Sequence, residues 1–170
     1  MATPFTSFVV KQAFGIAALN AGINAAYTFY LWRPLTPLTL FGEHGVGIDL
    51  STTPAVIGFL STILGTASLR KQLTDGRVTV GALLRAPALL HFLPTGVAVR
   101  SALIALVCGL LLGAPLYAAL RMNASALLSL GEAIGAKVAI TIVYSLMIVP
   151  AVIAAALADT QRRGRSVATV

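Results

Sequence analysis

The chain has 170 residues, of which 58% are hydrophobic and 10% charged, and its mean hydropathy is +0.91. A soluble domain carries roughly a quarter charged residues because its surface faces water, so this composition excludes an ordinary soluble protein. The net charge of +7 does not predict nucleic-acid binding, since the 12 Lys and Arg residues are spread thinly along apolar sequence. The composition predicts a protein whose surface faces the lipid bilayer or partner helices.

Four uncharged segments are long enough to cross a membrane, which takes about 20 apolar residues. They are 20 or 21 residues long and each is bounded by charged residues: 12–32, 50–69, 101–120 and 138–158. The first is not a cleaved signal peptide, because its apolar region is too long and its end is aromatic, at Tyr27, Phe29, Tyr30 and Trp32. The four segments predict an all-α membrane protein, a single four-transmembrane-helix bundle.

The Lys and Arg residues predict how the bundle is oriented. They concentrate between the second and third segments and after the fourth: Arg70, Lys71, Arg77, Arg85, Arg100, Arg162, Arg163 and Arg165. Because cytoplasmic connections of membrane proteins are rich in Lys and Arg, we expect both termini in the cytoplasm. The Ala-, Leu- and Arg-rich composition is typical of bacteria, so the expected location is the bacterial inner membrane.

The segments between the spans have distinct predicted structures. Residues 34–49 are rich in Pro and Gly, which predicts a structured outer loop. Residues 78–94 place apolar side chains near helical spacing around Arg85, which favours an amphipathic segment on the inner leaflet. Residues 160–170 are expected to form a loose basic tail. Gly109 and Gly113 have the spacing of a small-residue helix contact.

Asn20 and Asn24 are the most informative polar residues within a span. They are four residues apart, so they share one face of the first predicted helix. Such residues join neighbouring helices by hydrogen bonds. They could also provide a polar lining for a substrate or an ion. The first interpretation is the more common use of paired asparagines.

Three charged residues are expected at the same depth near the outer face, because the predicted helices run antiparallel. Asp49 begins the second span, and Glu132 and Lys137 precede the fourth. We expect Asp49 to pair with Lys137 and so to fix the helix register. The alternatives are contact with a substrate or proton, and unpaired side chains that reach the interface.

No catalytic constellation is found in the sequence. The single cysteine, Cys108, excludes dithiol redox chemistry. The two histidines, His44 and His91, are predicted on opposite sides of the membrane and therefore cannot share a metal or haem. Serine and zinc peptidase motifs and phosphate-binding glycine loops are missing. The sequence therefore predicts no cofactor, no metal and no enzymatic activity.

Short elements along most of the chain resemble a group of uncharacterised bacterial four-span inner-membrane proteins. These elements are Asn20, Asn24, Asp49-Leu50, Arg70-Lys71, Gly76-Arg77-Val78, Leu93-Pro94, Arg100, Ala114-Pro115, Lys137, Pro150 and Ala158-Asp159. The basic pair Arg70-Lys71 departs from the group, in which two arginines are expected slightly later. The resemblance implies the same topology, directs attention to Asn20, Asn24, Asp49 and Lys137, and implies no activity.

Three functions are compatible with these features. The first is a non-enzymatic accessory or assembly component that contacts other membrane proteins or a second copy through its helices. The second is a small transporter or channel with a polar path near the outer face. The third is an enzyme that modifies lipids. The first span offers little polarity inward of Asn20 apart from Gln12 and Lys11, which favours the first interpretation.

Overall fold

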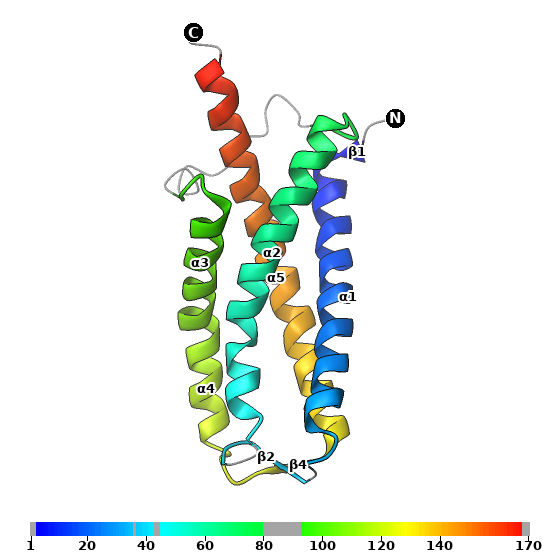
Figure 1. Cartoon of the computed structure of the whole chain (residues 1–170), viewed down its shortest axis with the longest axis vertical. Helices are drawn as coiled ribbons and strands as arrows, with labels where there is room; N and C mark the ends of the chain where they lie inside the picture. Colours follow the sequence, from blue (N-terminus) through cyan, green and yellow to red (C-terminus); the bar gives the residue numbers. More distant parts are fainter. Residues whose placement is uncertain (1–2, 36, 43–44, 80–92, 168–170) are drawn as a thin grey trace.

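The computed structural model describes residues 3–35, 37–42, 45–79 and 93–167, and its long helices form a bundle (Figure 1). The helical elements are α1 (Phe5–Trp32), α2 (Gly47–Thr74), α3 (Val97–Cys108), the π-helical turn η2 (Gly109–Gly113), α4 (Ala114–Arg121) and α5 (Leu130–Val167). The segments α3, η2 and α4 follow one another without a break and form one long helix. The start of α1 and the end of α5 lie at the same end of the bundle (Figure 1).

Each predicted apolar segment lies within a helix, and each helix extends beyond at least one of its flanking charges. Helix α2 continues past Arg70 to Thr74, and α5 begins before Lys137. The charges limit the apolar stretch rather than the helix, because Lys and Arg have good helix propensity. Helix α5 also continues to Val167, so most of the expected loose tail at 160–170 is helical and that prediction is wrong.

Three of the described helices are long and apolar enough to cross a membrane: Gly47–Thr74, Val97–Arg121 and Leu130–Arg162. Helix α1 has 28 residues, as many as α2. It is not among these three, and the polar residues Lys11, Gln12, Asn20 and Asn24 lie along it.

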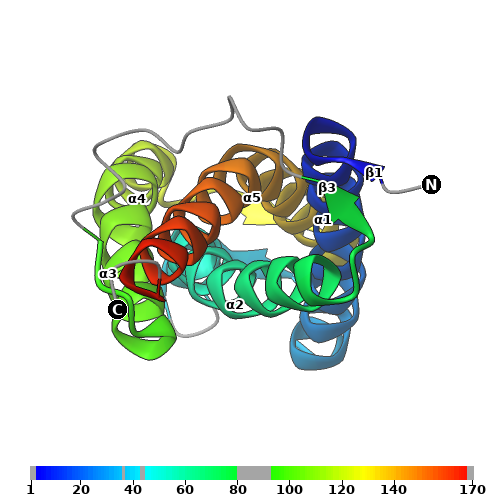
Figure 2. The same ribbon diagram turned by 90° about the horizontal axis from the view of Figure 1, so that it is seen from above.

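Helices α2 and α5 form the centre of the bundle, with α1 on one side and α3–α4 on the other (Figure 2). Near the end that holds the start of α1, a hydrophobic cluster joins Phe8 of α1, Leu69 of α2 and Ile153 of α5. A second cluster joins Ile57 of α2 and Cys108 of α3 to α5. Helix α5 therefore shares an apolar cluster with every other long helix.

Glycines allow α2 to approach its neighbours closely. A Cβ atom on Gly113 would collide with the backbone oxygen of Ser51, and one on Gly58 would lie 3.1 Å from the sulfur of Cys108. A Cβ atom on Gly65 would lie 3.2 Å from Val152 of α5. The predicted helix contact at Gly109 and Gly113 is thus confirmed, with α2 as the partner.

Two short strand pairs join the connections at the ends of the bundle. Strand β2 (Leu38–Thr39) pairs antiparallel with β4 (Leu127–Leu128), so the first and third connections are tied together. Strand β1 (Thr3–Pro4) pairs in parallel with β3 (Val78–Thr79) at the opposite end. Leu38 and Val46 are buried, which confirms the structured loop expected after the first span.

Some sequence predictions concern residues outside the described ranges. The amphipathic segment expected at 78–94 falls mostly on residues 80–92, and the structure does not test it. His44 and His91 also lie outside the described residues.

Candidate functional site

Two of the charged residues predicted near the outer face, Asp49 and Lys137, form an ion pair between α2 and α5. Lys137 Nζ lies 2.7 Å from Asp49 Oδ1 and donates a hydrogen bond of 3.0 Å to the backbone oxygen of Asp49. The Lys137 side chain is 4% exposed, whereas that of Asp49 is 21% exposed. The ring of Tyr27 on α1 lies 6.0 Å from Lys137 Nζ. The predicted pairing is confirmed, and we call it the outer ion pair after the face on which the sequence predicts it.

Glu132 does not join the outer ion pair but lies in the first turn of α5 and caps the start of that helix. Its carboxylate accepts hydrogen bonds of 2.8 Å from both the backbone nitrogen and the hydroxyl of Ser129. In return, the Glu132 backbone nitrogen donates to the Ser129 hydroxyl at 3.2 Å. This reciprocal arrangement is a capping box, which satisfies backbone groups at a helix start. Glu132 therefore has a structural role at the surface.

The two asparagines of α1 differ in their contacts. Asn20 is buried, and its Nδ2 donates a hydrogen bond of 3.1 Å to the hydroxyl of Ser145 on α5. Asn24 Nδ2 donates instead to the backbone oxygen of Asn20, at 2.9 Å within the same helix. Asn20 thus joins two helices, as the more common interpretation predicts, whereas Asn24 supports the position of Asn20.

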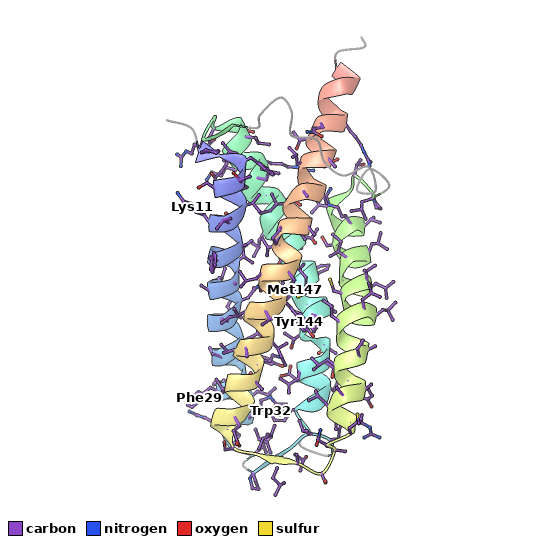
Figure 3. The ribbon with its side chains drawn as sticks, turned by 180° about the vertical axis from the view of Figure 1, so that it is seen from behind. Lys11, Phe29, Trp32, Tyr144 and Met147 are labelled. Carbon is purple, nitrogen blue, oxygen red and sulfur yellow. The ribbon has the colours of Figure 1, made fainter. Side chains whose placement is uncertain are left out.

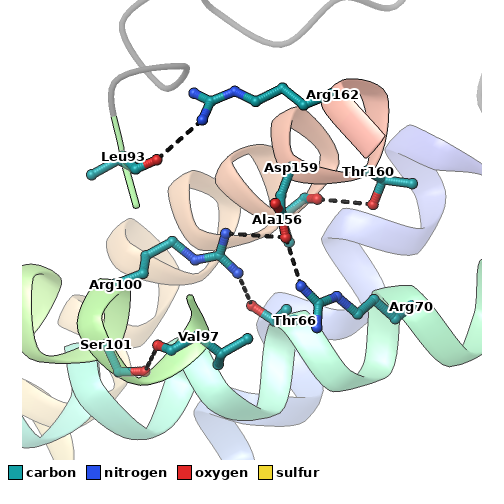
Figure 4. Close-up of polar contacts among 10 residues, drawn as sticks. All are labelled: Thr66, Arg70, Leu93, Val97, Arg100, Ser101, Ala156, Asp159, Thr160 and Arg162. Carbon is teal, nitrogen blue, oxygen red and sulfur yellow. Dashed lines mark hydrogen bonds and ion pairs between the residues drawn. The ribbon is translucent and has the colours of Figure 1, made fainter. Parts of the chain in front are cut away.

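A second charged group lies at the other end of the bundle (Figure 4). Asp159 Oδ2 lies 2.6 Å from Arg70 Nη2 and 3.7 Å from Arg100 Nη1, and Arg100 Nη2 donates to Thr66 Oγ1 at 3.0 Å. The Arg100 and Asp159 side chains are 2% and 3% exposed. These residues tie α2, α3 and α5 together, and we call them the inner charge cluster because they lie at the end opposite the outer ion pair.

Hydroxyl side chains occupy the interior between the two charged groups. Ser61, Thr62, Thr141 and Ser145 of α2 and α5 are fully buried. Thr62 donates to the backbone oxygen of Gly58. The hydroxyls of Ser61, Thr141 and Thr28, which is also buried, find no hydrogen-bond partner among the described residues. Thr141 and Ser145 lie in the half of α5 nearer Lys137, and Ser61 and Thr62 lie near the middle of α2.

An apolar groove of about 370 Å³ lies between α3–η2 and α5. Leu103, Val107 and Leu112 line one side, and Met147, Ala151 and Ala155 of α5 line the other. Leu93, which precedes α3, lines it as well, and Arg162 Nη1 donates a hydrogen bond of 3.3 Å to the Leu93 backbone oxygen. Met147 is seen on α5 in Figure 3.

Sequence reasoning found the outer ion pair and missed the inner charge cluster. The same argument would have found both, because Arg70, Arg100 and Asp159 each flank a predicted span at the same face. Arg70 and Arg100 carry the charge that predicts the orientation of the chain, and both also pair with Asp159. The groove could not have been predicted, since it depends on how far apart two neighbouring helices lie.

The fold and the buried polar residues define a helical membrane protein, with three helices that meet the length and apolarity of a membrane span. Comparison of the chain with protein-family models, with curated proteins and with solved structures found no match.

Proposed function

We propose that the chain is a four-span protein of the bacterial inner membrane, with both termini in the cytoplasm, that acts as a non-enzymatic accessory or assembly component. Helix α1 supports a fourth span because it packs along α5. Lys11 lies in the first half of α1, and the aromatic residues Phe29 and Trp32 lie at its other end (Figure 3). Basic residues at the inner end and aromatic residues at the outer interface are typical of a membrane-spanning helix.

The observation that carries this function is the position of α3–α4 at the edge of the bundle. In the most apolar 18-residue stretch of Val97–Arg121, 11% of the residues are buried within the chain, against 56% in the corresponding stretch of α2. Val99, Leu106 and Leu110 are each about 60% exposed along one helical face. An apolar helix held along one side can pack its other side against another membrane helix. We therefore propose that this exposed face of α3 and η2, which points away from the bundle, contacts a partner protein or a second copy.

The charged residues support a structural rather than a catalytic role. Lys137 and Asp159, both buried, are each held by an opposite charge from another helix. Unpaired charges within a membrane are costly, so such pairs fix the helices in one register. This arrangement suits a rigid component that presents a constant surface.

The experiment is a tagged pull-down after extraction of membranes in a mild detergent. We expect the wild-type chain to migrate as a stoichiometric complex and a variant with Leu106→Ala and Leu110→Ala to lose the partner. Ile23→Ala on α1, which removes a side chain of similar exposure, is the matched control and should retain it. A wild-type chain that runs as a monomer without a stoichiometric partner would exclude this function.

The buried hydroxyls favour a small transporter or channel as the second candidate. The first span offers little polarity inward of Asn20, which argues against a polar path through the membrane along α1. Ser61 and Thr66 of α2 now supply buried polar groups inward of the depth of Asn20, and Thr141 of α5 adds one nearer the outer ion pair. Ion flux in liposomes that Thr141→Val abolishes, without loss of thermal stability, would favour transport over the accessory function.

A further inference from the structure

We propose that the groove between α3–η2 and α5 binds one acyl chain of an anionic phospholipid, whose headgroup lies beside Arg162 and the inner charge cluster. This inference rests on the proposed insertion of the bundle in the membrane. It does not depend on which protein the exposed face of α3 and η2 contacts.

The groove has the chemistry of an acyl-chain site. Its lining is apolar and includes small residues of α5, Ala151 and Ala155, opposite Leu103 and Val107 of α3. Its volume of about 370 Å³ falls within the range of small-ligand sites, about 300–1,000 Å³. In a membrane, the molecules that reach such a surface from the side are lipids.

The inner end of the groove is positively charged. Ala151, Ala155 and Asp159 follow one another at intervals of four residues, so they lie along one face of α5, and Arg162 follows within a turn. Arg70 and Arg100 share the single carboxylate of Asp159, and Arg162 adds a further positive charge. The four residues together carry a net charge of +2. Basic pockets between helices on the cytoplasmic side attract anionic headgroups.

Arg162 connects this charge to the groove itself. Its guanidinium donates to the backbone oxygen of Leu93, and Leu93 lines the groove. Figure 4 shows Arg162 extending from α5 across to the segment that leads into α3, at the same end as Arg100. A phosphate at the end of a chain seated in the groove would therefore meet Arg162 first. The occupant with this combination of chemistry is an anionic phospholipid of the inner leaflet.

The test is native mass spectrometry of the purified full chain with phosphatidylglycerol or phosphatidylcholine of identical acyl chains. We expect the chain to retain phosphatidylglycerol in preference. Arg162→Gln should reduce this preference about fivefold, the effect of one basic residue near a headgroup, and should leave phosphatidylcholine retention unchanged. Ala151→Phe and Met147→Trp each fill the groove and should lower retention of both lipids. Leu106→Phe, on the exposed face of α3 outside the groove, is the control and should retain both lipids as the wild type does.

Equal retention of the two lipids by the wild-type chain would overturn the proposal. So would wild-type retention in both groove-filling variants, if their melting temperatures show that they are folded. A dimer of the chain that disappears in Ala151→Phe, with no lipid bound to the wild type, would show that a second copy occupies the groove instead. Because the purified chain is used, failure of the pull-down described above does not affect this result.

Discussion

Asp159 Oδ2 on α5 lies 3.7 Å from Arg100 Nη1 on α3, and both side chains are almost fully buried. Arg70 shares the same carboxylate oxygen at 2.6 Å, so one acidic residue holds two basic ones. At the opposite end, Asp49 and Lys137 join α2 to α5. Since α2 and α5 are the central helices, charged contacts at both ends fix their register.

Replacement of Asp159 by Asn should destabilise the protein strongly. Removal of one partner from a buried ion pair leaves an uncompensated charge, which costs roughly 3–5 kcal/mol. The melting temperature of the detergent-solubilised protein should fall accordingly. Asp75→Asn is the matched control, because Asp75 lies 3.7 Å from the well-exposed Arg77 and surface pairs contribute about 0–1 kcal/mol. Equal effects of the two substitutions would contradict the structural importance of the inner charge cluster.

The outer ion pair should show energetic coupling between α2 and α5. We expect Asp49→Asn and Lys137→Met each to lower the free energy of unfolding. The double variant should lose less than the sum of the two losses, because it leaves no charge of the pair without its partner. Chemical denaturation in detergent measures the three values. If Asp49→Asn leaves stability unchanged but abolishes a growth or uptake phenotype, Asp49 contacts a substrate and the transporter interpretation gains.

The two asparagines of α1 should differ in their contribution to stability. Asn20→Ala removes the hydrogen bond to Ser145 between helices, which is expected to cost about 0.6–2 kcal/mol in a membrane bundle. Asn24→Ala removes a contact within α1 and should cost less. Ser145→Ala should add little to Asn20→Ala if the two residues act as a pair. Full additivity of these two substitutions would argue against the contact.

Gly113→Ala should weaken the contact between α2 and η2. The added methyl group would collide with the backbone oxygen of Ser51, and overpacking of this kind costs roughly 1–3 kcal/mol. Gly15→Ala is the control, because among the described residues no atom beyond the adjacent turn of its own helix lies within 4 Å of the position that its methyl group would occupy. Thermal stability in detergent distinguishes the two, and a Gly113→Ala protein as stable as the Gly15→Ala protein would contradict the close approach of α2.

The helices were predictable from the sequence, but their ends were not. The apolar segments reflect the thickness of a bilayer, whereas the ends of the helices depend on local capping, as at Ser129 and Glu132. Helix α2 ends instead where Gly76 adopts a positive φ of 66°, a conformation that glycine accepts readily. Lys11 marks the limit of an apolar segment but lies well within α1.

The candidate site was predictable in part, for a similar reason. Asp49 and Lys137 are opposite charges at one predicted depth, so depth alone suggested their pairing. The contact between Asn20 and Ser145 also requires the rotation of α1 and α5 about their axes, which side-chain packing determines. The groove depends on the spacing between α3 and α5, which no local pattern in the sequence records.

The topology is tested most directly by labelling single cysteines in intact cells, in a chain with Cys108→Ala. The exposed positions Thr6, Thr74 and Met122 suit this measurement. Gly45 is unsuitable, because a side chain there would lie 2.8 Å from the Phe41 backbone, and Gly76 is unsuitable because its backbone favours glycine. Four spans with cytoplasmic termini predict that a membrane-impermeant reagent labels Met122→Cys, and labels Thr6→Cys and Thr74→Cys after the membrane is opened. Labelling of Thr6→Cys in intact cells, together with protection of Thr74→Cys, would show that α1 does not cross the membrane.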